Sequence, residues 1–236
     1  MTEARLADAT SPEVEARVAA SPSTLLIPLG ATEQHGPHLP LDTDSRIAEA
    51  LAEGAAARLA DAVAAPVLPF GSSGEHQAFA GTLSIGATAT EQVLIELGRS
   101  ATETFDRLLF VNAHGGNAAP LAAAVALLRS EDRDVRAWVP RFGGDAHAGR
   151  TETSLMLALS PERVRDGRAS PGNVAPLTEL IDDLRVDGVR LLSPNGILGD
   201  PTGASPGEGH ALLGSAIDDL CTTVRDWPAP VIAGRR

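Results

Sequence analysis

Carboxylate and imidazole side chains cluster just after the first apolar segment of the chain. Four candidate metal ligands stand out within twelve residues of a sequence otherwise rich in alanine and leucine: Glu33, His35, His38 and Asp44. In an extended backbone, positions two apart lie on the same face, so Glu33 and His35 can act on one centre. This density favours a binding site over a polar loop with two surface histidines.

Two later segments have the same character. His114 ends an apolar run and is followed by Gly115 and Gly116, whose missing side chains let the backbone approach a ligand closely. His147 and Glu152 bracket the start of an expected helix, and Glu152 would fall in its first turn. The alternatives are an incidental histidine in a turn and a carboxylate that only complements the helix dipole.

Glu75 and His76 follow another short apolar run. For these two residues a role at the site and an ordinary surface role are equally open.

Histidine and carboxylate side chains without cysteine are a ligand set suited to zinc, manganese or iron(II). Carboxylates can also bridge two ions. Two ions about 3.5–4 Å apart make a bound water acidic enough to attack an amide near neutral pH. These residue types therefore predict a metal-dependent hydrolase.

One segment has the sequence pattern of a serine hydrolase but lacks the structural context that this pattern needs. Residues 203–207 read Gly-Ala-Ser-Pro-Gly, the pattern of a serine nucleophile elbow. Pro206 has no backbone N–H to stabilise an oxyanion, and no apolar strand leads into the segment. We interpret it as a helix start, with Ser205 as the N-cap and Pro206 at the first position. The chain has no P-loop, G-x-G-x-x-G or H-E-x-x-H motif.

Short apolar runs that alternate with Ala- and Leu-rich segments must position these residues. They predict strands at 24–29, 66–70, 107–112 and 134–139, and helices at about 45–62, 91–105 (capped by Thr88 or Thr90), 118–130, 152–159 and 207–225. This alternation predicts an α/β fold with a mostly parallel sheet. Such sheets carry their chemistry beyond the carboxyl ends of the strands, where the candidate residues fall.

The composition limits the possible partners and environment. The chain has 236 residues, which suits one domain, and a net charge of −12, which argues against binding nucleic acid or an anionic membrane. Its one cysteine, Cys221, excludes an internal disulfide. No apolar run is long enough to span a membrane, and residues 1–20 lack the features of a signal peptide. We therefore expect a cytoplasmic protein.

Taken in order, the segments 33–40, Asp44, 114–117 and 147–154 resemble the creatininase family, and the similarity extends over roughly residues 22–225. The resemblance implies a three-layer α/β/α sandwich with a mostly parallel central sheet. It implies a single domain over residues 1–236, in which 1–20 is an N-terminal extension. It also implies a homo-oligomer.

The resemblance further implies two divalent metal ions per chain, of zinc, iron(II) or manganese. Glu33 and His114 would bind one ion, His35 the other, and Asp44 would bridge them. Creatininase itself has a glutamate ligand two residues after the histidine that matches His114, where this chain has a glycine. Glu152 is the candidate to replace that ligand.

The family resemblance also suggests the reaction. Residues 27–44, 74–86 and 196–202 look especially like the members that act on a modified, ribosomally made precursor peptide. The implied reaction hydrolyses an amide near the C-terminus of that peptide and releases a dipeptide derived from Val-Tyr. His147 matches a histidine that carries a proton near the substrate, a role that Glu152 could share.

A peptide substrate needs an open pocket, and the glycine-rich loops at 71–74, 143–144 and 196–209 could form its rim. Two alternatives stay open. One is an amidohydrolase of the same family that acts on a small cyclic amide or a formamide. The other is a metal-binding protein without catalysis.

Overall fold

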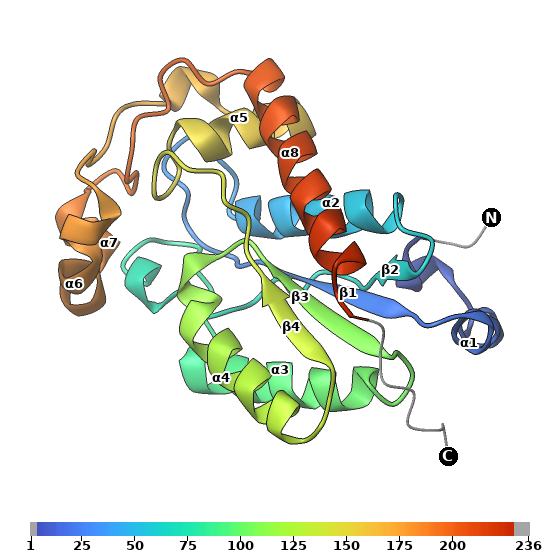
Figure 1. Ribbon diagram of the computed structural model, residues 1–236. Helices are drawn as coiled ribbons and strands as arrows, with labels where there is room; N and C mark the ends of the chain where they lie inside the picture. The colour runs from blue at the N-terminus through green and yellow to red at the C-terminus, as the bar shows by residue number, and fades with distance from the viewer. Residues whose placement is uncertain (1–3, 229–236) are drawn as a thin grey trace.

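The computed structural model describes residues 4–228, whose central feature is a parallel sheet of four strands. Its order is β2-β1-β3-β4, with bounds β1 Thr24–Leu29, β2 Ala62–Ala64, β3 Arg107–Asn112 and β4 Val135–Trp138. Every residue of β1 and β3 is buried, because helices cover both faces of the sheet (Figure 1). None of the helices between residues 4 and 228 combines the length and apolar character of a membrane span.

The helices form a layer on each side of the sheet. One face is covered by α2 (Thr43–Ala56), α5 (Arg150–Leu159) and α8 (Pro206–Arg225), and the other by α1 (Ser11–Ala20), α3 (Ala87–Ala101) and α4 (Ala118–Ser130) (Figure 1). Each face has its own apolar core. The α/β/α sandwich with a parallel central sheet is therefore confirmed.

Two further helices, α6 (Leu177–Asp187) and α7 (Val189–Leu192), lie together at one end of the molecule (Figure 1). They contact the short 3-10 helix η2 (Gly74–His76). The other 3-10 helices are η1 (Leu6–Asp8), η3 (Gly115–Asn117), η4 (Pro161–Arg163) and η5 (Asp166–Arg168).

Several expected elements are confirmed. Strands β1 and β3 and helix α4 have the predicted bounds. Ser205 caps α8 by accepting a hydrogen bond from the Glu208 N–H at 3.3 Å, and Pro206 stands in its first turn. Residues 203–207 are thus a helix start and not a nucleophile elbow. Cys221 is buried in the core.

The prediction of a strand at 66–70 is wrong. Strand β2 lies earlier, at Ala62–Ala64, because α2 ends at Ala56 instead of continuing to 62. Pro66 and Pro69 have no N–H to donate to a neighbouring strand, and between them Leu68 makes one isolated bridge to Leu29.

The expected start of α3 is also wrong. The helix begins at Ala87 after Gly86, which adopts a φ of 79°, and neither Thr88 nor Thr90 caps it. It ends at Ala101, before the predicted end at 105.

The amino ends of the strands are joined by direct polar contacts. The buried Arg107 guanidinium donates to the Asp61 carboxylate at 2.8 Å and to the Trp227 carbonyl at 3.2 Å. Asp106 accepts from the Ser23 N–H at 2.9 Å. These bonds tie the start of β3 to β1, β2 and the segment after α8.

Candidate metal centre

The structure brings all six predicted site residues together beyond the carboxyl ends of β1 and β3. These strands pair in parallel with Leu29 opposite Asn112, so the loops that follow them start side by side. The loop after β1 carries Glu33 and His35, the first turn of α2 carries Asp44, His114 follows β3, and His147 and Glu152 flank the start of α5.

One group of ligand atoms is formed by Glu33, Asp44 and His114, which lie within 4.8 Å of one another. His114 Nε2 lies 3.3 Å from Glu33 Oε2, and His114 Nδ1 lies 3.3 Å from Asp44 Oδ2. His114 Nε2 also lies 2.8 Å from the Ser72 carbonyl oxygen. If Nε2 donates its hydrogen to that oxygen, Nδ1 keeps a lone pair directed at Asp44.

A second group is formed by His35, Asp44 and Glu152. His35 Nε2 lies 3.1 Å from Asp44 Oδ1 and 3.7 Å from Glu152 Oε2. The other ring nitrogen of His35 lies 3.2 Å from the Glu33 carbonyl oxygen, which orients the ring. Asp44 therefore turns one carboxylate oxygen to each group, as a bridging ligand would.

Three carboxylate oxygens of this cluster are buried without a hydrogen-bond partner: both oxygens of Glu33, and Oδ2 of Asp44. Burying ionised oxygens in this way is costly unless a positive charge lies beside them. Nitrogen and carboxylate donors around such oxygens suit divalent cations of the zinc, manganese and iron(II) class. The residues present thus fit a metal centre.

The electrostatics of the centre favour bound positive charge. Burial raises the pKa of Glu33 to about 8, against the opposing effect of His114. Burial alone would lower the pKa values of His35 and His114, but nearby carboxylates, Asp44 for His35 and Glu33 for His114, raise both to about 10. Bound protons or bound metal ions can balance the negative charge of these carboxylates.

His147 lies against the same cluster but has a different environment. Its Nδ1 is 3.8 Å from Glu33 Oε1, and its ligand atom falls within 4.8 Å of those of Glu33 and His35. Burial, reinforced by His35 and His76, holds the pKa of His147 well below its ordinary value. A neutral imidazole at this place can accept a proton or bind an ion.

The structure adds His76, whose role the sequence left open, and excludes His38 from the cluster. His76 Nε2 lies 3.3 Å from Glu33 Oε1, and the His76 ring lies 4.4 Å from that of His147. His38 lies elsewhere, with its Nε2 2.8 Å from Thr153 Oγ1. The position of His76 after an apolar run was a usable signal.

Glu75 belongs to none of the ligand groups. Its Oε1 lies 2.7 Å from the place where a β-carbon on Gly116 would be. Glu75 therefore takes up space next to Gly116.

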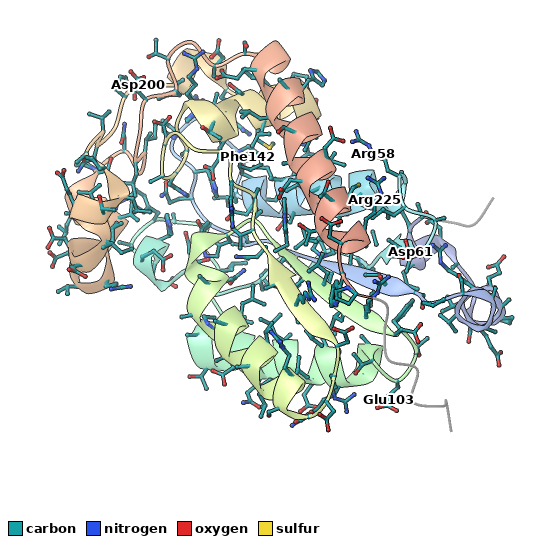
Figure 2. All side chains as sticks on the ribbon, viewed as in Figure 1. Arg58, Asp61, Glu103, Phe142, Asp200 and Arg225 are labelled. Atoms are coloured by element: carbon teal, nitrogen blue, oxygen red, sulfur yellow. The ribbon has the colours of Figure 1, made fainter. Side chains whose placement is uncertain are left out.

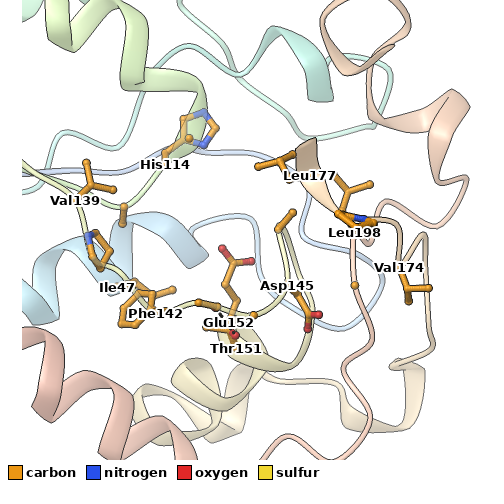
Figure 3. Close-up of a pocket in the computed structure, with 18 of the residues that line it drawn as sticks. Ile47, His114, Val139, Phe142, Asp145, Thr151, Glu152, Val174, Leu177 and Leu198 are labelled. Carbon is orange, nitrogen blue, oxygen red and sulfur yellow. Dashed lines mark hydrogen bonds between the residues drawn. The ribbon is translucent and has the colours of Figure 1, made fainter. Parts of the chain in front are cut away.

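A cavity of about 470 Å³ opens beside the centre, and His114 and Glu152 are part of its wall (Figure 3). Its other walls are largely apolar, with side chains of Ile47, Val139, Phe142, Val174, Leu177 and Leu198. In Figure 2, Phe142 lies near the middle of the molecule and Asp200 on the outer loop before α8. Gly143, Gly144 and Gly199 line the cavity as expected, whereas the 71–74 loop does not.

Comparisons with known proteins find chains similar to this one over most of its length. The family model for creatininase, described as creatinine amidohydrolase, matches residues 7–224. The mycofactocin precursor peptide peptidase of Mycobacterium ulcerans is 51% identical over 223 residues, which cover 89% of each chain. The creatinine amidohydrolase of Pseudomonas putida is 30% identical over 91% of this chain and 93% of its own.

Solved structures give the same result for the fold. A crystal structure of creatinine amidohydrolase superposes with a TM-score of 0.83 at 25% identity, over 97% of this chain and 100% of that chain. Related creatininase structures at 25% identity include a manganese form and a mutant of Zn-Zn type, with TM-scores of 0.78 and 0.79. They cover 95% and 96% of this chain, respectively, and 98% of their own.

Proposed function

Because the chain belongs to the creatininase family, we propose that it is a metal-dependent hydrolase that cleaves a modified ribosomal precursor peptide near its C-terminus. The product is the dipeptide derived from Val-Tyr in mycofactocin biosynthesis. The observation that carries the chemistry is the set of buried oxygens of Glu33 and Asp44 that have no hydrogen-bond partner, beside an open cavity. The substrate is proposed from the similarity to the peptidase, which is greater than that to creatinine amidohydrolase.

The proposed centre holds two divalent ions. Glu33, Asp44 and His114 would hold one ion, and His35, Asp44 and Glu152 would hold the other. Zinc, manganese and iron(II) all suit this donor set. When bound, the ions polarise the scissile carbonyl and lower the pKa of a water molecule.

The chain's own residues move the protons. His147 presents Nδ1 to the centre, where it can take a proton and pass it to the leaving amine. Glu152 extends into the cavity from the first turn of α5 (Figure 3) and is the second candidate for this role. Without a bound ion, burial raises the pKa of Glu152.

The cavity determines which substrates can reach these groups. Its apolar walls and the glycine loop at 143–144 suit the side chains of a peptide tail. The alternative substrates, small cyclic amides and formamides, would use the same ions and ligands. Gly116, which stands in place of a creatininase ligand, argues against creatinine itself.

A direct assay separates these functions. Metal-loaded protein is incubated with the modified precursor peptide, with the unmodified peptide, and with creatinine, small lactams and formamides, and products are identified by mass spectrometry. We expect release of the modified dipeptide, and no release after treatment with a chelator. Hydrolysis of a small amide without peptide cleavage would support the alternative, and no hydrolysis at all would leave a metal-binding role.

We also propose that the protein acts in the cytoplasm as a homo-oligomer. Light scattering on the purified chain measures the oligomeric state, and a mass equal to one chain would contradict it. Fractionation of cells that produce the protein tests its location.

A further inference from the structure

Gln34 lies between the two metal-ligand candidates Glu33 and His35, yet its side chain turns towards two other histidines. Its carboxamide oxygen accepts the Gly36 N–H at 2.9 Å, which orients the amide group. The amide nitrogen then faces three atoms: the Gly196 carbonyl oxygen at 3.0 Å, His76 Nδ1 at 2.8 Å and His147 Nε2 at 3.2 Å. An amide nitrogen has only two hydrogens to donate, so one of these contacts is not a hydrogen bond.

The backbone of Gln34 identifies which contact that is. His147 Nε2 lies 2.8 Å from the Gln34 carbonyl oxygen, an atom that only accepts hydrogen bonds. Nε2 of His147 therefore carries a hydrogen and cannot also accept one from the Gln34 amide. As a result, Nδ1 of His147 has the lone pair, and it faces Glu33 Oε1 at 3.8 Å.

The two amide hydrogens of Gln34 then go to the Gly196 carbonyl and to His76 Nδ1. Since Nδ1 of His76 accepts, a neutral His76 carries its hydrogen on Nε2. That atom lies 3.3 Å from Glu33 Oε1, the same oxygen that His147 approaches. The two rings lie 4.4 Å apart between their centres.

We propose that Gln34 is a positioning residue that fixes His76 and His147 in complementary roles at one oxygen of Glu33. Through its backbone carbonyl it keeps the Nδ1 lone pair of His147 directed at the centre. Through its side-chain amide it keeps an N–H of His76 directed at the centre. His147 can thus accept a proton while His76 supports the negative charge of Glu33.

The packing around Gln34 supports a fixed amide position. Gly196 has a φ of 82°, and a β-carbon there would lie 2.0 Å from Gln34 Oε1. The absence of a side chain at Gly196 therefore lets the backbone pack directly against the Gln34 carboxamide. Gln34 itself is only 5% exposed.

The test measures which ring nitrogens of His76 and His147 carry a hydrogen. Zinc-loaded protein labelled with ¹⁵N-histidine is studied by long-range ¹H–¹⁵N correlation, which distinguishes protonated from unprotonated ring nitrogens. We expect both His76 and His147 to carry hydrogen on Nε2 and none on Nδ1. In Gln34→Glu the carboxylate can only accept, so we expect hydrogen to appear on His76 Nδ1 while His147 stays unchanged, because the backbone carbonyl remains.

Several results would overturn the proposal: hydrogen on Nδ1 of either ring in the unaltered protein, an unchanged His76 in Gln34→Glu, or a switch of both rings together. The unaltered protein decides the tautomers even where the variant fails to fold. Gln92→Glu, which adds the same charge on an exposed position of α3, is the matched control and should change neither ring.

The consequence for turnover rests on the proposed function. Loss of an outer partner that holds a side chain in place at a metal centre typically costs about 10–100-fold in activity. We expect Gln34→Glu to lower kcat for the peptide within that range, with KM and ion content unchanged. An inactive unaltered protein with the expected tautomers would contradict the proposed function and leave the role of Gln34 standing.

Discussion

Gly116 lies so close to Ser72 that a β-carbon on the glycine would be 2.1 Å from the Ser72 carbonyl oxygen. The same β-carbon would be 2.5 Å from His114 Nε2. Position 116, where the resemblance to creatininase implies a ligand, is thus closed to any side chain here, unless the Ser72 segment or the His114 ring moves.

Gly116→Ala should therefore displace the imidazole that donates to Ser72. We expect the affinity for the ion held by Glu33, Asp44 and His114 to fall about 10–100-fold, measured by titration calorimetry on chelator-treated protein. Gly115→Ala is the control, because no atom lies within 4 Å of its β-carbon position. Equal affinities for the two variants would show that the close approach has no role.

Asp44 faces both ligand groups, so its loss should affect both ions. We expect two ions per chain in the reconstituted protein, none in Asp44→Ala, and about one in Glu33→Ala, measured by elemental analysis. Without the bridging carboxylate, two cations would face each other with little screening. Asp42→Ala, which removes a half-buried carboxylate paired with Arg46, should keep both ions. Full activity with one ion would contradict the two-ion centre.

His147→Ala separates a proton carrier from a ligand. As a proton carrier, His147 should contribute about 10²–10⁴-fold to the rate without holding an ion. We expect both ions to stay and peptide turnover to fall by that factor. The exposed His210 gives the control variant His210→Ala, which should keep full turnover. If His147→Ala loses an ion instead, the contact of His147 with Glu33 and His35 belongs to metal binding.

Glu152→Gln tests the replacement of the missing ligand. The amide oxygen can still accept the hydrogen bond that Ala148 N–H makes to Glu152 Oε2 at 2.6 Å, so the loop should keep its shape. We expect loss of one ion, and in crystals of the metal-loaded protein a Glu152 oxygen about 2.0–2.2 Å from that ion.

An unchanged ion content with slower turnover would instead show that Glu152 acts on a water molecule, with a separation beyond about 3.5 Å. Glu208→Gln is the matched control. Glu208 occupies the first turn of α8 and pairs with Arg150 away from the ligand groups.

Far from the centre, Glu131 links the ends of α3 and α4. Hydrogen bonds from Arg99, and then from Arg133, lower the pKa of Glu131 to about 2 from an ordinary value of 4.5. A carboxyl group with a lowered pKa stabilises the fold fully above pH 4.5, and this contribution is lost as the pH falls towards 2.

We expect Glu131→Gln to lower the urea midpoint of unfolding at pH 7. The difference in midpoint between the variant and the unaltered protein should narrow between pH 4.5 and pH 3. Glu15→Gln, on the exposed side of α1, is the control and should show no such trend. A difference in midpoint that stays constant with pH would contradict a stabilising role for the contacts of Glu131 with Arg99 and Arg133.

The sequence predicted the parts of the site that depend on residue type and on strand ends. Glu33 and His114 follow continuous apolar runs that become β1 and β3, so their meeting could be expected from parallel pairing. The part played by Gln34 could not be expected. Its partners His76, His147 and Gly196 are 42, 113 and 162 residues away, and an amide carries no signal of which hydrogen bonds it will make.

The misplaced second strand has a local cause. The segment from Ala55 to Ala65 contains neither glycine nor proline, so the helix end at Ala56 and the strand start at Ala62 have no sequence marker. Small apolar residues there suit a helix by propensity, and pairing with β1 overrides that preference.

The two ends of the sheet are held by different chemistry, so with the proposed metal centre only one end would depend on bound ions for its order. At the amino ends, Arg107 closes its own contacts with Asp61 and Trp227. At the carboxyl ends, Glu33 and Asp44 leave buried oxygens for an ion to satisfy. With the proposed ions bound at Glu33 and Asp44, a chelator should therefore loosen the carboxyl end of the sheet while the amino end stays intact.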